Sequence, residues 1–169
     1  MPENIEIIIL NFKTVDLDNF IFNELNILNQ EIKSSHFYNN TECQDMELFQ
    51  VKSLTELFTK PNTGNVVFKQ LDFGISIKNV VFILSFNNDC GDIVINFPDN
   101  ELILNSAKAS KEKCLKVVLY IKYIMEKYNV EKVKIGYESA YDDDTCLVDI
   151  DREELNAAKI VEKICLNKF

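Results

Sequence analysis

The sequence predicts an α+β fold in which helices pack on one face of a mainly antiparallel β-sheet, as a single domain of residues 1–169. Three observations lead to this fold class. Segments rich in Val, Ile and Phe follow one another directly in the middle of the chain, as in antiparallel sheets. Segments with helical periodicity stand before and after them. A chain of this length also buries roughly 70% of its unfolded surface, enough for a core without disulfides or metal.

The first third of the chain predicts a strand followed by a helix. The near-continuous apolar run 5–12 is short enough for a buried strand. Asp16 is a suitable helix cap, and apolar residues after it recur at helical spacing, namely Leu17, Ile21, Leu25, Leu28 and Ile32. The polar residues 34–45 predict a loop. An alternative division sets residues 1–62 apart as a loosely attached N-terminal subregion.

Short elements are expected next, and then the sheet. Residues 46–51 predict a short strand, and Ser53 with Glu56 predicts the capping box of a brief helix. Residues 61–64 have the composition of a turn. The strands of the sheet are predicted at 65–71, 74–86 and 92–97. Residues 87–91 predict a hairpin between the last two, Asp92 beside it is an ordinary hairpin residue, and Pro98 ends the last strand.

The last third predicts a long helix, a hairpin and a final helix. The long helix spans Ser110–Tyr128, with Asn129 just beyond its end, and its apolar stripe is Cys114, Val117, Val118, Ile121, Ile124, Met125 and Tyr128. Alternation predicts strands at 133–137 and 145–150, joined by a loop. Asp151 is expected to cap the final helix, whose apolar stripe is Leu155, Ala158, Ile160, Val161 and Ile164.

Charge is concentrated in two adjoining segments. The chain has a net charge of −9. Residues 106–137 carry eight lysines and three acids, whereas residues 138–154 carry eight carboxylates and one arginine. An acidic chain repels phosphates, which disfavours nucleic acid and anionic membranes as ligands and favours a basic protein partner or metal ions.

Composition also indicates the compartment. No stretch approaches the roughly 18 apolar residues that span a membrane, and the first residues lack the features of a signal peptide. The five cysteines include no close pairs, which argues against a zinc site and a disulfide framework. We therefore expect reduced thiols and a cytoplasmic location.

The common catalytic motifs are missing from the sequence. His36 is the single histidine and stands in a polar segment without a neighbouring nucleophile. The four glycines are scattered, so no glycine-rich phosphate loop exists. These observations predict that the chain is not an enzyme and needs no cofactor.

The stretch 138–154 allows three interpretations. A calcium loop starting at Asp142 fails because Cys146 and Leu147 occupy positions that require an oxygen ligand and a glycine. A looser Mg²⁺ site of a hydrolase or nuclease would use the carboxylates Glu138, Asp142, Asp143, Asp144 and Asp149. The other interpretations are a solvated turn and a face for a basic protein partner.

The segment IGYESAYD, residues 135–142, resembles a G-[YF]-E-[PS]-A-x-D strand-and-turn motif of small bacterial immunity proteins. These belong to polymorphic-toxin and contact-dependent inhibition systems, and the resemblance covers residues 75–150. It implies inhibition of a cognate toxin domain, often a basic nuclease, by tight one-to-one binding.

The leading hypothesis is thus a non-enzymatic acidic protein that neutralises a toxin by direct binding. Its predicted contact residues are Glu138, Tyr141, Asp142, Asp143 and Asp144, with the tyrosine for packing and the acids for electrostatic steering. The alternatives are the metal-dependent hydrolase described above and a scaffold or homodimeric interaction domain.

Overall fold

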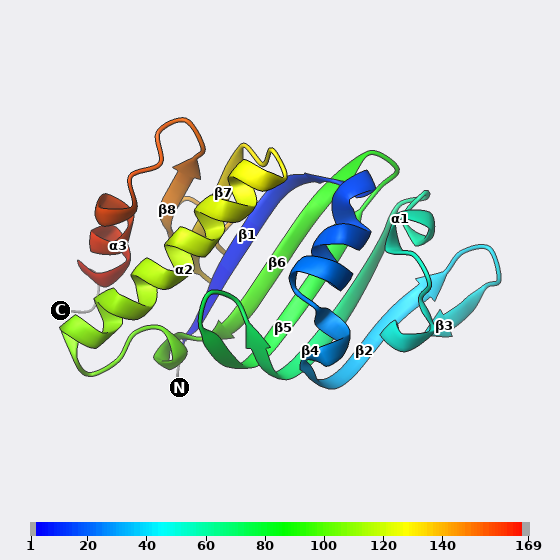
Figure 1. Cartoon of the computed structure of the whole chain (residues 1–169), viewed down its shortest axis with the longest axis horizontal. Helices are drawn as coiled ribbons and strands as arrows, with labels where there is room; N and C mark the ends of the chain where they lie inside the picture. The colour runs from blue at the N-terminus through cyan, green and yellow to red at the C-terminus, as the bar shows by residue number, and fades with distance from the viewer. Residues whose placement is uncertain (1–2, 167–169) are drawn as a thin grey trace.

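Val, Ile and Phe are frequent in the central strands of one antiparallel sheet, shown in Figure 1. The computed structural model describes residues 3–166. Neighbouring strands are antiparallel, in the order β3-β2-β4-β5-β6-β1-β7-β8 across the sheet. The predicted mainly antiparallel sheet is therefore confirmed. Its strands are β1 (Asn4–Lys13), β2 (Glu31–Asn39), β3 (Gln44–Met46), β4 (Asn62–Asp72), β5 (Ser76–Phe86), β6 (Cys90–Pro98), β7 (Lys132–Tyr137) and β8 (Cys146–Asp151).

The first strand, β1, lies between β6 and β7 in the interior of the sheet, third from one edge. Ile5, Ile7 and Ile9 belong to the main core, whereas Ile8 belongs to a second, smaller cluster on the opposite face. All four side chains are at most 1% exposed. Burial on both faces explains why this segment is a continuous apolar run instead of an alternating one.

The longest helix, α2, lies in front of β7 and runs beside β1 in Figure 1. Its apolar stripe is buried as predicted. Ser106 accepts a hydrogen bond from the Ala109 amide and caps the helix, which therefore begins before the predicted Ser110. Asn129 has a φ of 54°, the left-handed conformation expected just after a helix. The α-helices of the described residues are α1 (Leu54–Leu57), α2 (Ala107–Lys127) and α3 (Ala157–Leu166).

The predicted helix from Asp16 to Ile32 is wrong in its extent. Asn26 adopts a φ of 48°, which interrupts the helical backbone, and Leu28 beyond it is 56% exposed. Ile32 lies on β2. The short 3₁₀ and π-helical turns of the chain are η1 (Thr14–Asp16), η2 (Asn19–Glu24), η3 (Ile27–Asn29), η4 (Leu48–Gln50) and η5 (Asp99–Glu101).

The predicted loop at 34–45 is also wrong, because β2 and β3 occupy most of it. β2 pairs with β4, and of its residues only Phe37 is fully buried. Its polar side chains are tolerated because β2 lies near the edge of the sheet, where one face meets water. A strand with so few apolar positions has no clear period to read from the sequence.

Three smaller predictions also need correction. The strand predicted at 46–51 is wrong beyond Met46, which ends β3: Leu48–Gln50 form η4, because Glu47 and Gln50 make a capping box. The predicted turn at 61–64 is wrong, since β4 begins at Asn62 and pairs with β5 from there. Asp151 ends β8 and does not cap α3; Asn156 accepts a hydrogen bond from the Lys159 amide at that helix.

Of the predicted capping box of α1, the Ser53 half is confirmed. The Ser53 hydroxyl accepts a hydrogen bond from the Glu56 amide. The carboxylate of Asp18, from the turns after β1, also accepts hydrogen bonds from the Ser53 hydroxyl and the Leu54 amide, both at 2.6 Å.

No helix within residues 3–166 is long and apolar enough to cross a membrane.

Candidate functional site

The acidic segment closes the hairpin between β7 and β8, as predicted. Gly136 is paired with Cys146, and the Tyr137 amide donates to the Thr145 carbonyl at 2.9 Å. The turn between them, residues 138–145, is called the acidic loop below. Within it, the Asp142 carbonyl accepts the amides of Thr145 and Cys146 at 3.2 and 3.0 Å. The loop is therefore a hydrogen-bonded unit.

The acidic loop packs on the face of the sheet opposite the main core, called the second face below. Ala140 has no exposed surface and packs against Ile8 and Val94. Its amide donates a 2.9 Å hydrogen bond to Glu6 on β1. Gly136 allows this close approach, because a Cβ there would lie 2.4 Å from the Thr145 carbonyl oxygen. The loop is thus more than a solvated turn.

Glu6 is a nearly buried carboxylate, 8% exposed, with hydrogen bonds to both of its oxygens. One oxygen accepts the Ala140 amide, and the other accepts the side-chain amide of Asn96 at 3.3 Å. Because a buried carboxylate needs such partners, these two bonds hold the loop and β6 to β1.

Tyr141 extends from the loop to the far strand β6. Its hydroxyl donates to one carboxylate oxygen of Asp92 at 3.0 Å, and the other oxygen of Asp92 accepts the Asn11 amide at 3.0 Å. Burial raises the pKa of the Tyr141 phenol well above its usual value, and the hydrogen bond to Asp92 and its negative charge raise it further. The side chain nevertheless remains 45% exposed.

The predicted contact residues lie together on this one loop. Asp142, Asp143 and Asp144 are all exposed at its tip. Glu138 is exposed at its start and accepts a 3.2 Å hydrogen bond from the side chain of Asn4. The backbone of the loop thus presents four carboxylates and one tyrosine to solvent, held in place from below by Glu6 and Asp92.

The carboxylates of the metal-site alternative are not gathered into one group. Asp149 lies on β8, where its cross-strand neighbour is Lys134. Among residues 3–166, no three His, Cys, Asp or Glu side chains lie close enough together to hold a metal ion. His36 is exposed on β2, and its ring lies 2.9 Å from the Asp45 carboxylate on β3.

Glu6 and Asp92 are site residues that sequence reasoning missed. Asp92 was predicted as an ordinary hairpin residue, and Glu6 as one position of a buried apolar run. The charged Glu6 inside that run was a usable signal, because a buried acid requires a partner. No local pattern indicates that the partner is the backbone of Ala140, 134 positions away.

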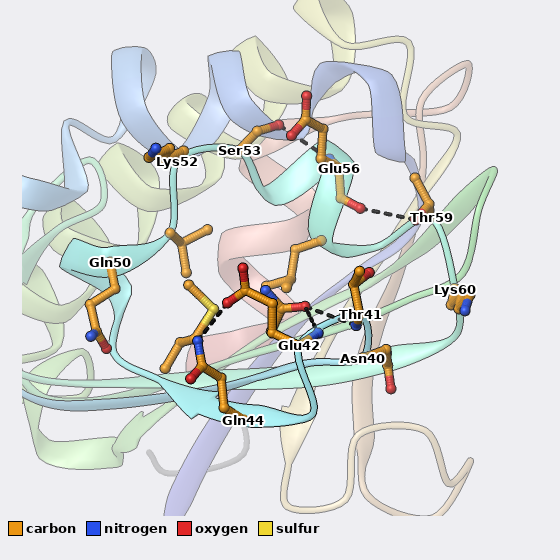
Figure 2. A pocket seen from close by; sticks show the side chains of 14 residues that line it. Asn40, Thr41, Glu42, Gln44, Gln50, Lys52, Ser53, Glu56, Thr59 and Lys60 are labelled. Carbon is orange, nitrogen blue, oxygen red and sulfur yellow. Dashed lines mark hydrogen bonds between the residues drawn. The ribbon is translucent and has the colours of Figure 1, made fainter.

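Two surface hollows flank the sheet. Figure 2 shows one of about 510 Å³ between the β2–β3 hairpin and α1, with side chains of both charges around it: Glu42, Lys52, Glu56 and Lys60. A second, of about 590 Å³, lies where the ends of β4, β5 and β6 meet Asn11, and Asp92 forms part of its wall. The second hollow therefore adjoins the residue that holds Tyr141.

Comparison with known proteins places the chain in a family. A chain in the 1.75 Å crystal structure of the toxic C-terminal tip of CdiA from Pseudomonas aeruginosa in complex with immune protein has a TM-score of 0.66 and 18% identity. The match covers 88% of this chain and 95% of that chain, and it shows a shared fold. No curated protein matches. The PABL017 Cdi1I immunity protein family model matches residues 3–153, so the chain belongs to that family.

Proposed function

We propose that this chain is an immunity protein that neutralises a cognate bacterial toxin domain by direct one-to-one binding, without catalysis. The family match carries the proposal, because it spans residues 3–153 and includes the whole acidic loop. The shared fold with a chain from a complex of a CdiA toxin tip and immune protein supports a toxin tip of the CdiA type as the partner.

The proposed contacts are those predicted from the sequence: Glu138, Tyr141, Asp142, Asp143 and Asp144. The exposed acids would attract a basic toxin surface over a distance and so accelerate association. Tyr141 would supply contact area, since a half-exposed tyrosine held by a hydrogen bond loses little freedom on binding.

Helices on one face of the sheet are part of the proposal, because that arrangement leaves the other face to the partner. Buried residues of α2 and α3 share the main core with Ile5, Ile7 and Ile9 of β1. The second face contributes a separate cluster of Ile8, Val94 and Ala140. This division between two clusters supports helices on the main-core side.

The proposal places binding in the cytoplasm of the cell that makes the chain. All five cysteines are free thiols, which fits a reducing compartment. A basic partner follows from the charge of the loop and of the whole chain, −9.

The test is binding of the purified chain to the C-terminal toxin domain encoded beside its own gene. We expect a saturable one-to-one complex and loss of toxicity when the two are co-expressed. In the triple variant Asp142→Asn, Asp143→Asn and Asp144→Asn, association should slow by about tenfold at low salt, with a flatter salt dependence.

A matched control removes the same charge elsewhere. The triple variant Glu31→Gln, Glu42→Gln and Asp72→Asn changes three exposed acids near the opposite edge of the sheet. Its association rate should stay much closer to that of the wild type. Equal slowing by both triple variants would mean that net charge matters and the acidic loop does not. Absence of any complex with the wild-type chain would overturn the proposed function itself.

A further inference from the structure

The second face of the central strands carries apolar side chains where a solvated sheet carries polar ones. Cross-strand pairs join Ile83 on β5 to Val94 on β6, and Val94 to Ile8 on β1. In the next row, Val67 on β4 is paired with Val81 on β5. Antiparallel sheets that face water on one side usually alternate apolar and polar residues, so this face departs from that pattern.

The acidic loop covers only part of these residues. Ile8 and Val94, beneath Ala140, are 0% and 8% exposed. Val67, Val81 and Ile83 lie farther along the sheet and keep partial contact with solvent. Ile83 packs against the edge of the covered cluster. We call Val67, Val81 and Ile83 the sheet-face patch.

The 590 Å³ hollow adjoins the sheet-face patch at one end. Ser85, two positions after Ile83 on the same face, lines it together with Thr63 and Asp92. Gly91 forms part of its wall, where a Cβ would lie 2.2 Å from the Ser85 carbonyl oxygen. The hollow is therefore bounded partly by bare backbone and carries one carboxylate, that of Asp92.

The geometry points to the sheet-face patch as the apolar centre of the toxin-binding surface, with the acidic loop as its charged rim. This inference rests on the proposed function. Specific interfaces combine a desolvated apolar centre with a polar rim, and Tyr141 with Asp92 stands at the boundary between the two. The occupant is a basic toxin surface that places an apolar side chain on Ile83 and Val81, with a lysine or arginine near Asp92.

Charge also argues against a second copy of this chain as the occupant. A two-fold dimer places the same patch on both sides of the interface. Two such faces would place both acidic loops, each with Asp142 to Asp144 exposed, at the border of one interface. The carboxylates of the two loops would repel each other there, whereas a basic toxin surface would be attracted to them.

The experiment measures the dissociation constant for the toxin domain encoded beside the chain's own gene. Ile83→Lys and Val81→Lys place a cation in the apolar centre and should each weaken binding by about 30-fold or more. The milder variant Ile83→Thr keeps a β-branched residue in the strand and should weaken binding by about tenfold. Circular dichroism and thermal melting verify that each variant is folded.

A matched control places the same charge on another exposed apolar side chain. Leu119, on α2, is 48% exposed, and Leu119→Lys should change the dissociation constant by less than about twofold. If the wild type binds and the folded Ile83 and Val81 variants bind equally well, the sheet-face patch is not the interface. If the wild type fails to bind, the proposed function is wrong, and the inferred interface falls with it.

Discussion

The hydroxyl of Tyr141 donates a 3.0 Å hydrogen bond to the carboxylate of Asp92, and this bond fastens the acidic loop to strand β6. Together with the bond from the Ala140 amide to Glu6, it anchors the loop at two points on two different strands. The exposed carboxylates Asp142, Asp143 and Asp144 thus follow directly after an anchored segment. A pre-positioned loop loses less conformational entropy when a partner binds.

The Glu6 carboxylate is expected to be important for the stability of the loop. Glu6→Leu leaves the buried Ala140 amide without an acceptor, and unfolding should become easier by about 2 kcal/mol. Glu6→Gln retains one acceptor oxygen and should cost less. Urea denaturation measures both values, and equal stability of wild type and Glu6→Leu would show that the bond contributes nothing.

Gly136 is required because the loop returns closely over it. In Gly136→Ala the new Cβ would lie 2.4 Å from the Thr145 carbonyl oxygen and 3.1 Å from the Ala140 side chain. We expect a loss of about 1–3 kcal/mol in the free energy of unfolding, as for overpacked cores. Lys134→Ala, on the same strand and the same face, is the control and should change stability by less than about 0.5 kcal/mol.

The Tyr141 phenol should make stability depend on pH in the alkaline range. Burial and Asp92 raise its pKa in the folded chain, whereas an unfolded tyrosine titrates near pH 10. The folded state therefore holds the proton more tightly, and its stabilisation is present below about pH 10 and is lost as the pH rises through the folded pKa. The difference in unfolding free energy between wild type and Tyr141→Phe should hold steady up to about pH 10 and shrink as the pH rises above it. A constant difference above that pH would contradict the assignment.

The five thiols should react at very different rates. Cys43 is exposed, whereas Cys114 and Cys165 are buried with their sulfurs 3.8 Å apart. Burial, and next the neighbouring Cys165, raise the pKa of the Cys114 thiol, so little reactive thiolate forms. With a disulfide reagent at about pH 8, one fast phase should belong to Cys43 and disappear in Cys43→Ser. Cys114 and Cys165 should react only in denaturant, and fast labelling of either in the native chain would contradict this prediction.

The pattern of apolar residues along the chain was sufficient to predict those helices and strands that have a clear pattern of their own. The apolar run at Ile5 to Phe12, the stripe of α2 and the β7–β8 hairpin are all as predicted. In each case the residues carry a clear period of two or 3.6, or are apolar throughout. The acidic loop itself was recognised because the eight carboxylates of residues 138–154, four of them in the loop, are visible in the sequence.

Local pattern failed where a distant strand supplies the partner. β2 is polar at most positions and becomes a strand because β4 offers its hydrogen bonds. The helix after Asp16 ends early because Asn26 takes a left-handed backbone conformation. The helical spacing of apolar residues gives no indication of that conformation. For β2, pairing with a distant strand outweighs the residues' own preferences, whereas at Asn26 the backbone conformation of one residue ends the helix.

The sequence by itself determined the central strands, the long helix and the charge of the acidic loop, because these depend on residue type and spacing along the chain. Only the tertiary structure decided what lies beneath that loop. Glu6, Asp92 and Ala140 are distant in sequence and meet because the strand order places β1 between β6 and β7. Strand order depends on long-range packing, so the loop could be recognised as acidic from its residues but as anchored only from the fold.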